Sequence, residues 1–281
     1  MSQTEVTRSQ RVAELLAQSR YEVLPLDGIE EEVLEHVPRE VTITVTASPT
    51  KGLEPTVDLT ARLVAQGYTV VPHLSARLIA SRDHLTQLVS RLGEIGVADV
   101  FVVAGDAPEA HGPYAGSVEL LEEMAALGHR FADVGITGYP ESHPLIDDET
   151  TIQAMFDKAR FATYIASQVC FDPRITAQWI ENVWARGTRL PILVGIPGAV
   201  PRTKLLKVST RIGIGDSLRF LRKNSSFVSR FMHGGFDPDP LIDGLGDVVT
   251  DPERKIAGFH IFTFNDVADT ETWRRRRMAP A

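Results

Sequence analysis

The chain has 281 residues, of which 43% are hydrophobic and 23% charged, as in an ordinary globular protein. Its formal net charge is −8, and this excess of acidic residues argues against a nucleic-acid partner, which would favour a basic surface. Cys170 is the only cysteine, so the chain can form neither an intramolecular disulfide nor a multi-cysteine zinc site.

The N-terminal segment predicts a helix rather than a targeting signal. Met1–Arg11 has neither the apolar run nor the cleavage pattern of a signal peptide, and Thr7–Gln18 has a helical pattern. No uninterrupted apolar stretch approaches the ~20 residues that a membrane helix needs. We therefore expect a cytoplasmic protein without a membrane partner.

Short β-rich runs then alternate with helical patterns along the chain. The runs are Arg20–Leu26, Val41–Ala47, Thr69–Ser75, Asp99–Gly105, Phe131–Tyr139, Tyr164–Phe171, Leu190–Ile196 and Ile256–Phe264. Several are almost continuously apolar, which is typical of parallel strands buried on both faces. Helical patterns that end at a glycine lie between them, as repeated βα units predict, at Val57–Gln66, Asp83–Ile95, Ser117–Leu127 and Ile175–Ala185.

The connection between the last two runs is about sixty residues long, so we expect it to hold at least two helices, at Lys204–Ile212 and Ser217–Phe231. Eight βα units without a break in composition predict one closed (β/α)8 barrel over residues 1–281, with an extra N-terminal helix at about 7–19 and the barrel at about 20–280. The alternative is an open doubly wound sheet, which favours a glycine-rich phosphate turn after the first strand. Leu24–Gly28 contains no such turn, so the barrel is favoured.

Polar side chains stand at the ends of the predicted strands, where the active site of such a barrel lies. They include Glu22, Thr46, Ser48, His73, Asp106, Tyr139, His143 and Gln168. Each has a structural alternative, because strand-end polar residues also satisfy loops. Glu22 could face outward or pair with an arginine, and His73 could support the second strand. Asp106 could cap the next turn, and the amide of Gln168 could be satisfied by a neighbouring backbone.

Other kinds of site are less well supported by the sequence. His73, His143 and Asp106 show no ligand-pair spacing such as H-x-x-x-H, so we predict no metal site. The chain has no G-x-S-x-G elbow and no Walker loop, which disfavours nucleophilic hydrolysis and phosphoryl transfer.

The strand-end motifs, taken in order, resemble those of the methylenetetrahydrofolate reductases, whose catalytic domain is a (β/α)8 barrel. The fifth-strand motif Gly138–Pro144 resembles Tyr-Pro-Glu-x-His-Pro, and the sixth-strand motif Ser167–Asp172 resembles Thr-Gln-x-x-Phe-Asp; these are the specific matches. Less specific matches are Tyr21–Pro25 to Glu-x-x-Pro, Pro72–Ser75 to His-Leu-Thr, Gly105-Asp106 to Arg-Gly-Asp and Pro191–Ile196 to Pro-x-x-x-Gly-Ile. The resemblance covers the chain from about Arg20 to Asn265.

This resemblance implies reduction of 5,10-methylenetetrahydrofolate to 5-methyltetrahydrofolate. N10 must be protonated so that the imidazolidine ring opens to a 5-iminium cation, which then accepts a hydride. The resemblance assigns Glu22 as the acid and Asp106 as a second catalytic group, and it assigns pterin binding to Asp106, Gln168 and Ile196. The side chains that would frame the cofactor are Thr46, Ser48, His73, Tyr114, Tyr139 and His143.

The chain departs from the family where typical members bind FAD. Ala104 replaces the arginine before Gly-Asp, and Phe156 and Asp157 stand in place of cations on the family's basic helix, leaving Lys158. Each lost charged hydrogen bond is worth about 1.5–3 kcal/mol, so flavin binding should be much weaker. We therefore expect direct hydride transfer from NADH, with NADPH as the second possible donor.

Three alternatives stay open at the level of sequence. The chain could be an FAD-dependent reductase with ping-pong kinetics, a folate-dependent one-carbon transferase, or a folate-binding barrel without catalysis. The cluster Arg274–Arg277 also has two interpretations: a solvated end of the last helix, which we favour, or a clamp on a dinucleotide phosphate.

Overall fold

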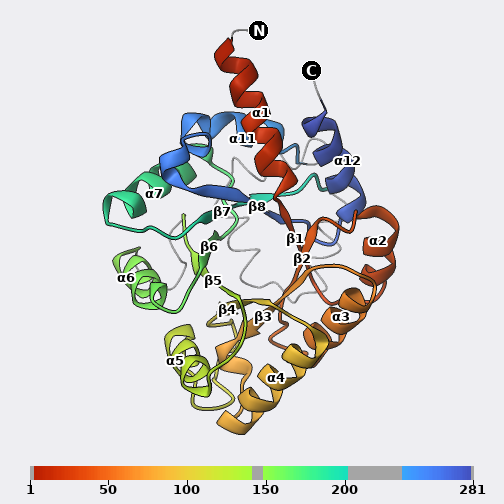
Figure 1. Cartoon of the computed structure of the whole chain (residues 1–281), viewed down its shortest axis with the longest axis vertical. Coiled ribbons are helices and arrows are strands. Elements are labelled where there is room, and N and C mark those ends of the chain that lie inside the picture. Colours follow the sequence, from red (N-terminus) through yellow and green to blue (C-terminus); the bar gives the residue numbers. More distant parts are fainter. Residues whose placement is uncertain (1–2, 141–147, 202–235, 280–281) are drawn as a thin grey trace.

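A computed structural model describes residues 3–140, 148–201 and 236–279 of the protein. Eight strands form a closed barrel in chain order, each parallel to the next and β8 parallel to β1 (Figure 1). The strands are β1 Arg20–Val23, β2 Thr42–Val45, β3 Val70–Ser75, β4 Asp99–Val103, β5 Asp133–Gly138, β6 Tyr164–Ser167, β7 Ile192–Pro197 and β8 Ile256–Phe262. The predicted (β/α)8 barrel is therefore confirmed.

Helices surround the barrel (Figure 1). They are α1 Gln3–Ala17, α2 Ile29–His36, α3 Glu54–Ala65, α4 Arg82–Ile95, α5 Ser117–Leu127, α6 Asp148–Ala159, α7 Pro173–Ala185, α11 Asp239–Gly244 and α12 Val267–Met278, with 3-10 turns η1 Ala76–Leu78, η2 Gly246–Val249 and η3 Pro252–Arg254. The predicted helices Lys204–Ile212 and Ser217–Phe231 lie outside the described residues. Among the described helices, none is both long enough and apolar enough to cross a bilayer.

The best-predicted helices are those with clear end signals. In α4, the Ser81 side chain accepts a hydrogen bond from the His84 N–H at the first turn, and Gly96 ends the helix with φ +93°. The N-terminal helix begins at Gln3 rather than near residue 7. The sequence patterns did not predict α2, because this short helix buries only Ile29 and Val33 and begins with consecutive glutamates.

Alternation along each strand divides the barrel into an outer and an inner core. Outward side chains pack with the helices in the main core; large examples are Tyr21, Ile43, Leu74, Val102, Ile165 and Phe259. Inward side chains form a smaller cluster that consists of Val71, Phe101, Tyr164, Ala166 and Leu193. Because the two faces alternate, every second residue of a strand points into the barrel. Each successive inward residue therefore lies one layer nearer the mouth than the one before it.

One inward layer of the barrel contains a charged cluster. The Arg20 guanidinium lies 2.7 Å from Asp99 and donates to the Tyr164 hydroxyl at 2.8 Å. The same hydroxyl donates to Asp99 at 3.0 Å, and the guanidinium also lies over the Tyr164 ring at 4.4 Å from its centroid. Arg20, two residues before Glu22, therefore pairs with Asp99.

The C-terminal arginines have acidic partners. Arg274 and Arg275 bond Glu271 at 2.8 and 2.6 Å, and Tyr21 donates to the same carboxylate at 2.7 Å. Burial raises the pKa of Glu271, but the hydrogen bonds from these three side chains outweigh burial and lower it. Arg276 bonds Asp239 at 3.0 Å and Arg277 bonds Asp243, so all four arginines pair with carboxylates on α11 or α12. Arg274 is only 5% exposed, so the expectation of a solvated helix end is wrong for this residue. The contacts of all four arginines favour a structural role over a phosphate clamp.

Candidate active site

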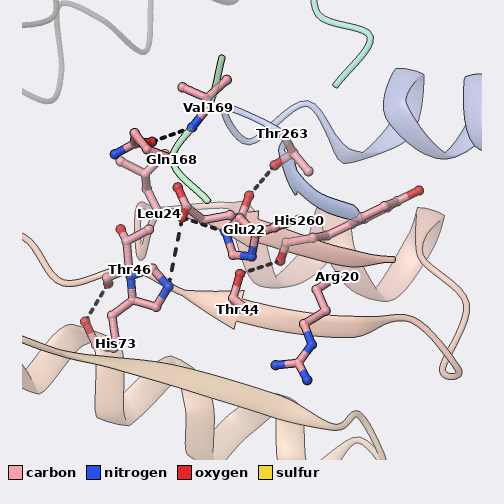
Figure 2. Close-up of polar contacts among 12 residues, drawn as sticks. Arg20, Glu22, Leu24, Thr44, Thr46, His73, Gln168, Val169, His260 and Thr263 are labelled. Atoms are coloured by element: carbon pink, nitrogen blue, oxygen red, sulfur yellow. Dashed lines mark hydrogen bonds and ion pairs between the residues drawn. The ribbon is translucent and has the colours of Figure 1, made fainter. Parts of the chain in front are cut away.

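Glu22 points into the barrel from β1 and meets two histidines (Figure 2). Its Oε2 lies 3.0 Å from Nε2 of His260 on β8 and 3.9 Å from Nε2 of His73 on β3. The side chains of Glu22, His73 and His260 are 16%, 8% and 2% exposed. Thr263 holds the strand in place, because its hydroxyl donates to the Glu22 carbonyl at 2.6 Å.

His260 is a member of this group that the sequence analysis did not single out. It lies between Gly258 and Phe262 on the inward face of β8, and Arg20 is its register partner on β1. In the sequence, the feature that could have indicated it is a single histidine within the otherwise apolar strand β8. In a closed barrel the first and last strands are neighbours, so that histidine stands beside the first strand.

His73 is electrically neutral in this environment. Burial lowers the pKa of His73 to about 4, although the nearby charge of Glu22 acts in the opposite direction. The ring packs against Phe101 at a centroid distance of 4.8 Å, and its Nε2 is buried without a hydrogen-bond partner among the described residues. His73 therefore places a polar but uncharged nitrogen beside the Glu22 carboxyl group.

The hydrogen bond between Glu22 and His260 is compatible with the proton on either Glu22 Oε2 or His260 Nε2. With the proton on His260 Nε2, the histidine donates to a carboxylate; with the proton on Glu22, the carboxylic acid donates to the ring nitrogen. Both forms keep the same two atoms 3.0 Å apart. The geometry thus lets His260 hydrogen-bond the Glu22 carboxyl group in either arrangement.

The ends of β4, β5 and β6 bring three further predicted residues to the rim. Tyr139 is half-buried, and burial, together with the charge of nearby Asp106, raises its pKa despite a hydrogen bond with Thr137. Asp106 is exposed one residue after Gly105. Gln168 is exposed at the end of β6, where its Oε1 accepts from the Val169 N–H at 2.8 Å (Figure 2).

Residues after β2 build the neighbouring loop. The Thr46 N–H donates to the Val23 carbonyl at 3.0 Å, and its own carbonyl accepts from the Thr56 hydroxyl at 2.7 Å. The Ser48 hydroxyl accepts from the Lys51 N–H at 3.3 Å and contacts the Thr50 hydroxyl at 3.2 Å. The structure therefore gives both residues loop-building contacts, and their contact with a cofactor remains a prediction.

Two predicted site residues lie in the outer core rather than on the inward face of the barrel, and their contact with a ligand remains a prediction. Ile196 shares its strand face with Ile192 and Val194 and is fully buried in the main core, because odd and even positions of β7 face opposite sides. Tyr114 is 4% exposed in the same core, where burial is the main cause of its raised pKa. His143 lies outside the described residues.

A hollow of about 500 Å³ lies elsewhere, between α6 and α7, and Tyr139 forms part of its wall. Its other boundaries include Thr151, Trp179 and Asn182, and Glu22 does not border it. The Glu22, His73 and His260 side chains therefore meet inside the barrel, apart from this hollow.

Gly105 fixes the approach to Asp106 and offers a direct test. It has φ +90°, and a Cβ there would lie 1.8 Å from the Ser75 hydroxyl oxygen. Gly67 has a similar φ of +88° but open space around it. We expect Gly105→Ala to lower the free energy of unfolding by at least about 1 kcal/mol more than Gly67→Ala, measured by urea titration. Equal losses in the two variants would contradict the proposed clash.

One solved structure with a TM-score above 0.5 supports the fold, and a second is similar at a lower score. The C-terminal domain of a putative chitinase from Desulfitobacterium hafniense DCB-2 matches with 12% identity and a TM-score of 0.52, over 93% of this chain and 99% of that one. A GH18 chitinase from Cycas revoluta, solved in complex with (GlcNAc)3, matches with 11% identity and a TM-score of 0.48, over 93% and 99% of the two chains. At such identities the comparison concerns fold alone.

Comparison with protein families gives a more specific match. A family model described as methylenetetrahydrofolate reductase matches residues 29–212. This range contains His73, Asp106 and Gln168, whereas Glu22 and His260 lie on the strands that flank it.

Proposed function

The chain belongs to the methylenetetrahydrofolate reductase family, and from this premise we propose that it reduces 5,10-methylenetetrahydrofolate to 5-methyltetrahydrofolate with Glu22 as the proton donor. One observation carries the proposal: the Glu22 carboxyl group lies inside the barrel with two imidazoles as its side-chain partners among the described residues. A donor at this position faces the mouth, where substrates of such barrels bind.

The proton-donor role depends on what surrounds the carboxyl group. A fixed cation in contact would favour the ionised form of an acid, which cannot donate a proton. Here Arg20 is engaged by Asp99 at 2.7 Å, and His73 is neutral because burial lowers its pKa to about 4. His260 Nε2, 3.0 Å away, orients the carboxyl group in either protonation state. Glu22 can therefore protonate N10 and open the imidazolidine ring.

The rim residues suit the polar edge of the pterin. The Asp106 carboxylate can accept hydrogen bonds from a ring N–H and from the exocyclic amine, and its charge favours the cationic iminium. The Gln168 amide can donate and accept along the same edge. Tyr139, beside Asp106, supplies a flat half-buried ring at this part of the rim. Together these groups would orient the iminium carbon toward a hydride donor.

The residues present do not fit the flavin that typical family members hold. Ala104 stands where the family has an arginine. It offers only a backbone carbonyl, which accepts a hydrogen bond from the Arg77 N–H at 3.0 Å. On α6, Phe156 packs toward the main core and Asp157 bonds Gln153 at 2.8 Å. Lys158 is only 5% exposed, and burial lowers its pKa to about 8. No exposed cation is therefore presented at these three helix positions for a pyrophosphate.

We accordingly propose direct hydride transfer from NADH to the iminium carbon in a ternary complex. Donor and acceptor carbons would need to approach to about 3–3.5 Å. NADH is proposed over NADPH because the sequence shows no arginine pair for a 2′-phosphate, and the arginines of α12 are engaged by carboxylates.

A visible absorption spectrum and an NADH-oxidation assay without added flavin test this function. We expect no flavin absorption, NADH oxidation that depends on methylenetetrahydrofolate, and intersecting rather than parallel double-reciprocal plots. Stoichiometric flavin, or activity only with FAD, would instead support the ping-pong reductase. A one-carbon transferase would not oxidise NADH, and a folate-binding barrel would bind folate without turnover.

A further inference from the structure

The Glu22 group has the composition and spacing of a metal site. One nitrogen from each of His73 and His260 and one oxygen from Glu22 all lie within 4.8 Å of one another. Two of the separations are 3.0 and 3.9 Å. Tetrahedral zinc with bonds of about 2.1 Å places its ligand atoms about 3.4 Å apart, so small side-chain movements would complete the site.

A second observation points to a missing ligand. His73 Nε2 is buried, has no hydrogen-bond partner within the part of the chain that the structure describes, and lies on the side of the ring that approaches Glu22. Leaving a buried polar atom unpaired costs about 1–3 kcal/mol, which a bound cation would remove. Phe101 packs against the His73 ring at 4.8 Å, and Phe262 packs edge-on against His260 at 4.9 Å. These aromatic contacts hold both imidazoles in place.

We propose that Glu22, His73 and His260 bind one zinc ion, which inhibits the enzyme. Two imidazoles and a carboxylate are ligands that zinc prefers, and three protein ligands leave a fourth position open. The metal would replace the hydrogen bond between Glu22 and His260 and release the proton that they share. The inhibitory part rests on the proposed function, because a carboxylate bound to zinc cannot act as the proton donor; the binding part does not.

Zinc binding to the purified, chelator-treated full chain is the primary test. We expect calorimetry to show one Zn²⁺ per chain. His73→Gln, His260→Gln and Glu22→Gln should each weaken binding by about 100-fold or more, since loss of supporting groups alone costs 10–100-fold. His111→Gln, which removes an exposed histidine outside the group, should bind like the wild type.

The Glu22→Gln variant keeps the size of the side chain, so it tests the site even if a histidine variant fails to fold. Absence of zinc binding by the wild type, or equal affinity in wild type and Glu22→Gln, would overturn the proposed site. These readings do not require reductase activity, so they remain decisive if the proposed function is wrong.

An activity measurement then tests inhibition. Zinc should slow NADH oxidation, a chelator should restore it, and a raised folate concentration should weaken the inhibition because substrate and metal compete for Glu22. Full activity of the zinc-loaded protein would overturn the inhibitory part while leaving the binding site established.

Discussion

Glu22→Gln is expected to lower kcat for methylenetetrahydrofolate reduction by about 10²–10⁴-fold, the usual contribution of a general acid. The amide has nearly the same shape as the carboxyl group but cannot deliver its proton to N10. Folate affinity should stay within a few-fold of the wild type, because pterin recognition is assigned to Asp106 and Gln168. Steady-state NADH oxidation and equilibrium folate binding measure the two quantities separately.

Glu30→Gln provides the matched control for this prediction. This variant has the same glutamate-to-glutamine substitution, but on α2, outside the barrel. There the Glu30 carboxylate pairs with Arg62 at 2.5 Å. An ion pair on the surface contributes little, so this variant should keep its activity and stability nearly unchanged. A Glu22→Gln enzyme with more than about a hundredth of the wild-type kcat would contradict the proton-donor role, because loss of a general acid should cost at least about 10²-fold.

The architecture was predictable because it depends on patterns that are local in sequence. Continuous apolar runs such as Val100–Ala104 become strands buried on both faces, and helix-ending glycines such as Gly96 mark the end of each βα unit. Closure then requires only that eight such units follow one another. The same patterns predict that Glu22, His73 and Asp106 lie in or directly after their strands, toward the carboxyl ends.

Which way a side chain faces was harder to predict. Ile196 was placed at the site by its motif, but its strand phase puts it in the outer core with Ile192. Tyr114 lies in a loop, where no alternation exists to reveal that it packs beside the helices. His260 was missed because its partner is on the other end of the chain, and only barrel closure brings β8 against β1. Long-range contacts of this kind are not encoded in local periodicity.

Arg20→Met is expected to lower the free energy of unfolding by about 3 kcal/mol, because removing one partner of a buried ion pair leaves the other charge uncompensated. The side chains of Arg20 and Asp99 are 20% and 10% exposed, so Asp99 would keep little access to water. Urea titration of the wild type and the variant at neutral pH measures the loss. Since Arg20 immediately precedes Tyr21 and Glu22, the same experiment tests how much this ion pair stabilises β1, which carries the proposed proton donor.

The double variant Arg20→Met with Asp99→Asn separates charge from packing. The Asp99→Asn change removes the uncompensated charge but keeps an amide oxygen that can still accept from the Tyr164 hydroxyl, as the Asp99 carboxylate does at 3.0 Å. Most of the stability lost in Arg20→Met should therefore return in the double variant.

The pH dependence gives a further check on the single variant. Burial already raises the pKa of Asp99, and Arg20 opposes that rise. Without Arg20 the folded-state pKa rises further above the unfolded value, so the folded variant retains a proton that the unfolded chain loses. Its stability relative to the wild type should therefore fall as pH rises through the interval between the folded-state pKa values of Asp99 in the wild type and in the variant. The loss of stability should be smaller in acid.

A double variant as unstable as Arg20→Met would contradict the charge explanation. The lost stability would then come from the packing of the Arg20 side chain over the Tyr164 ring.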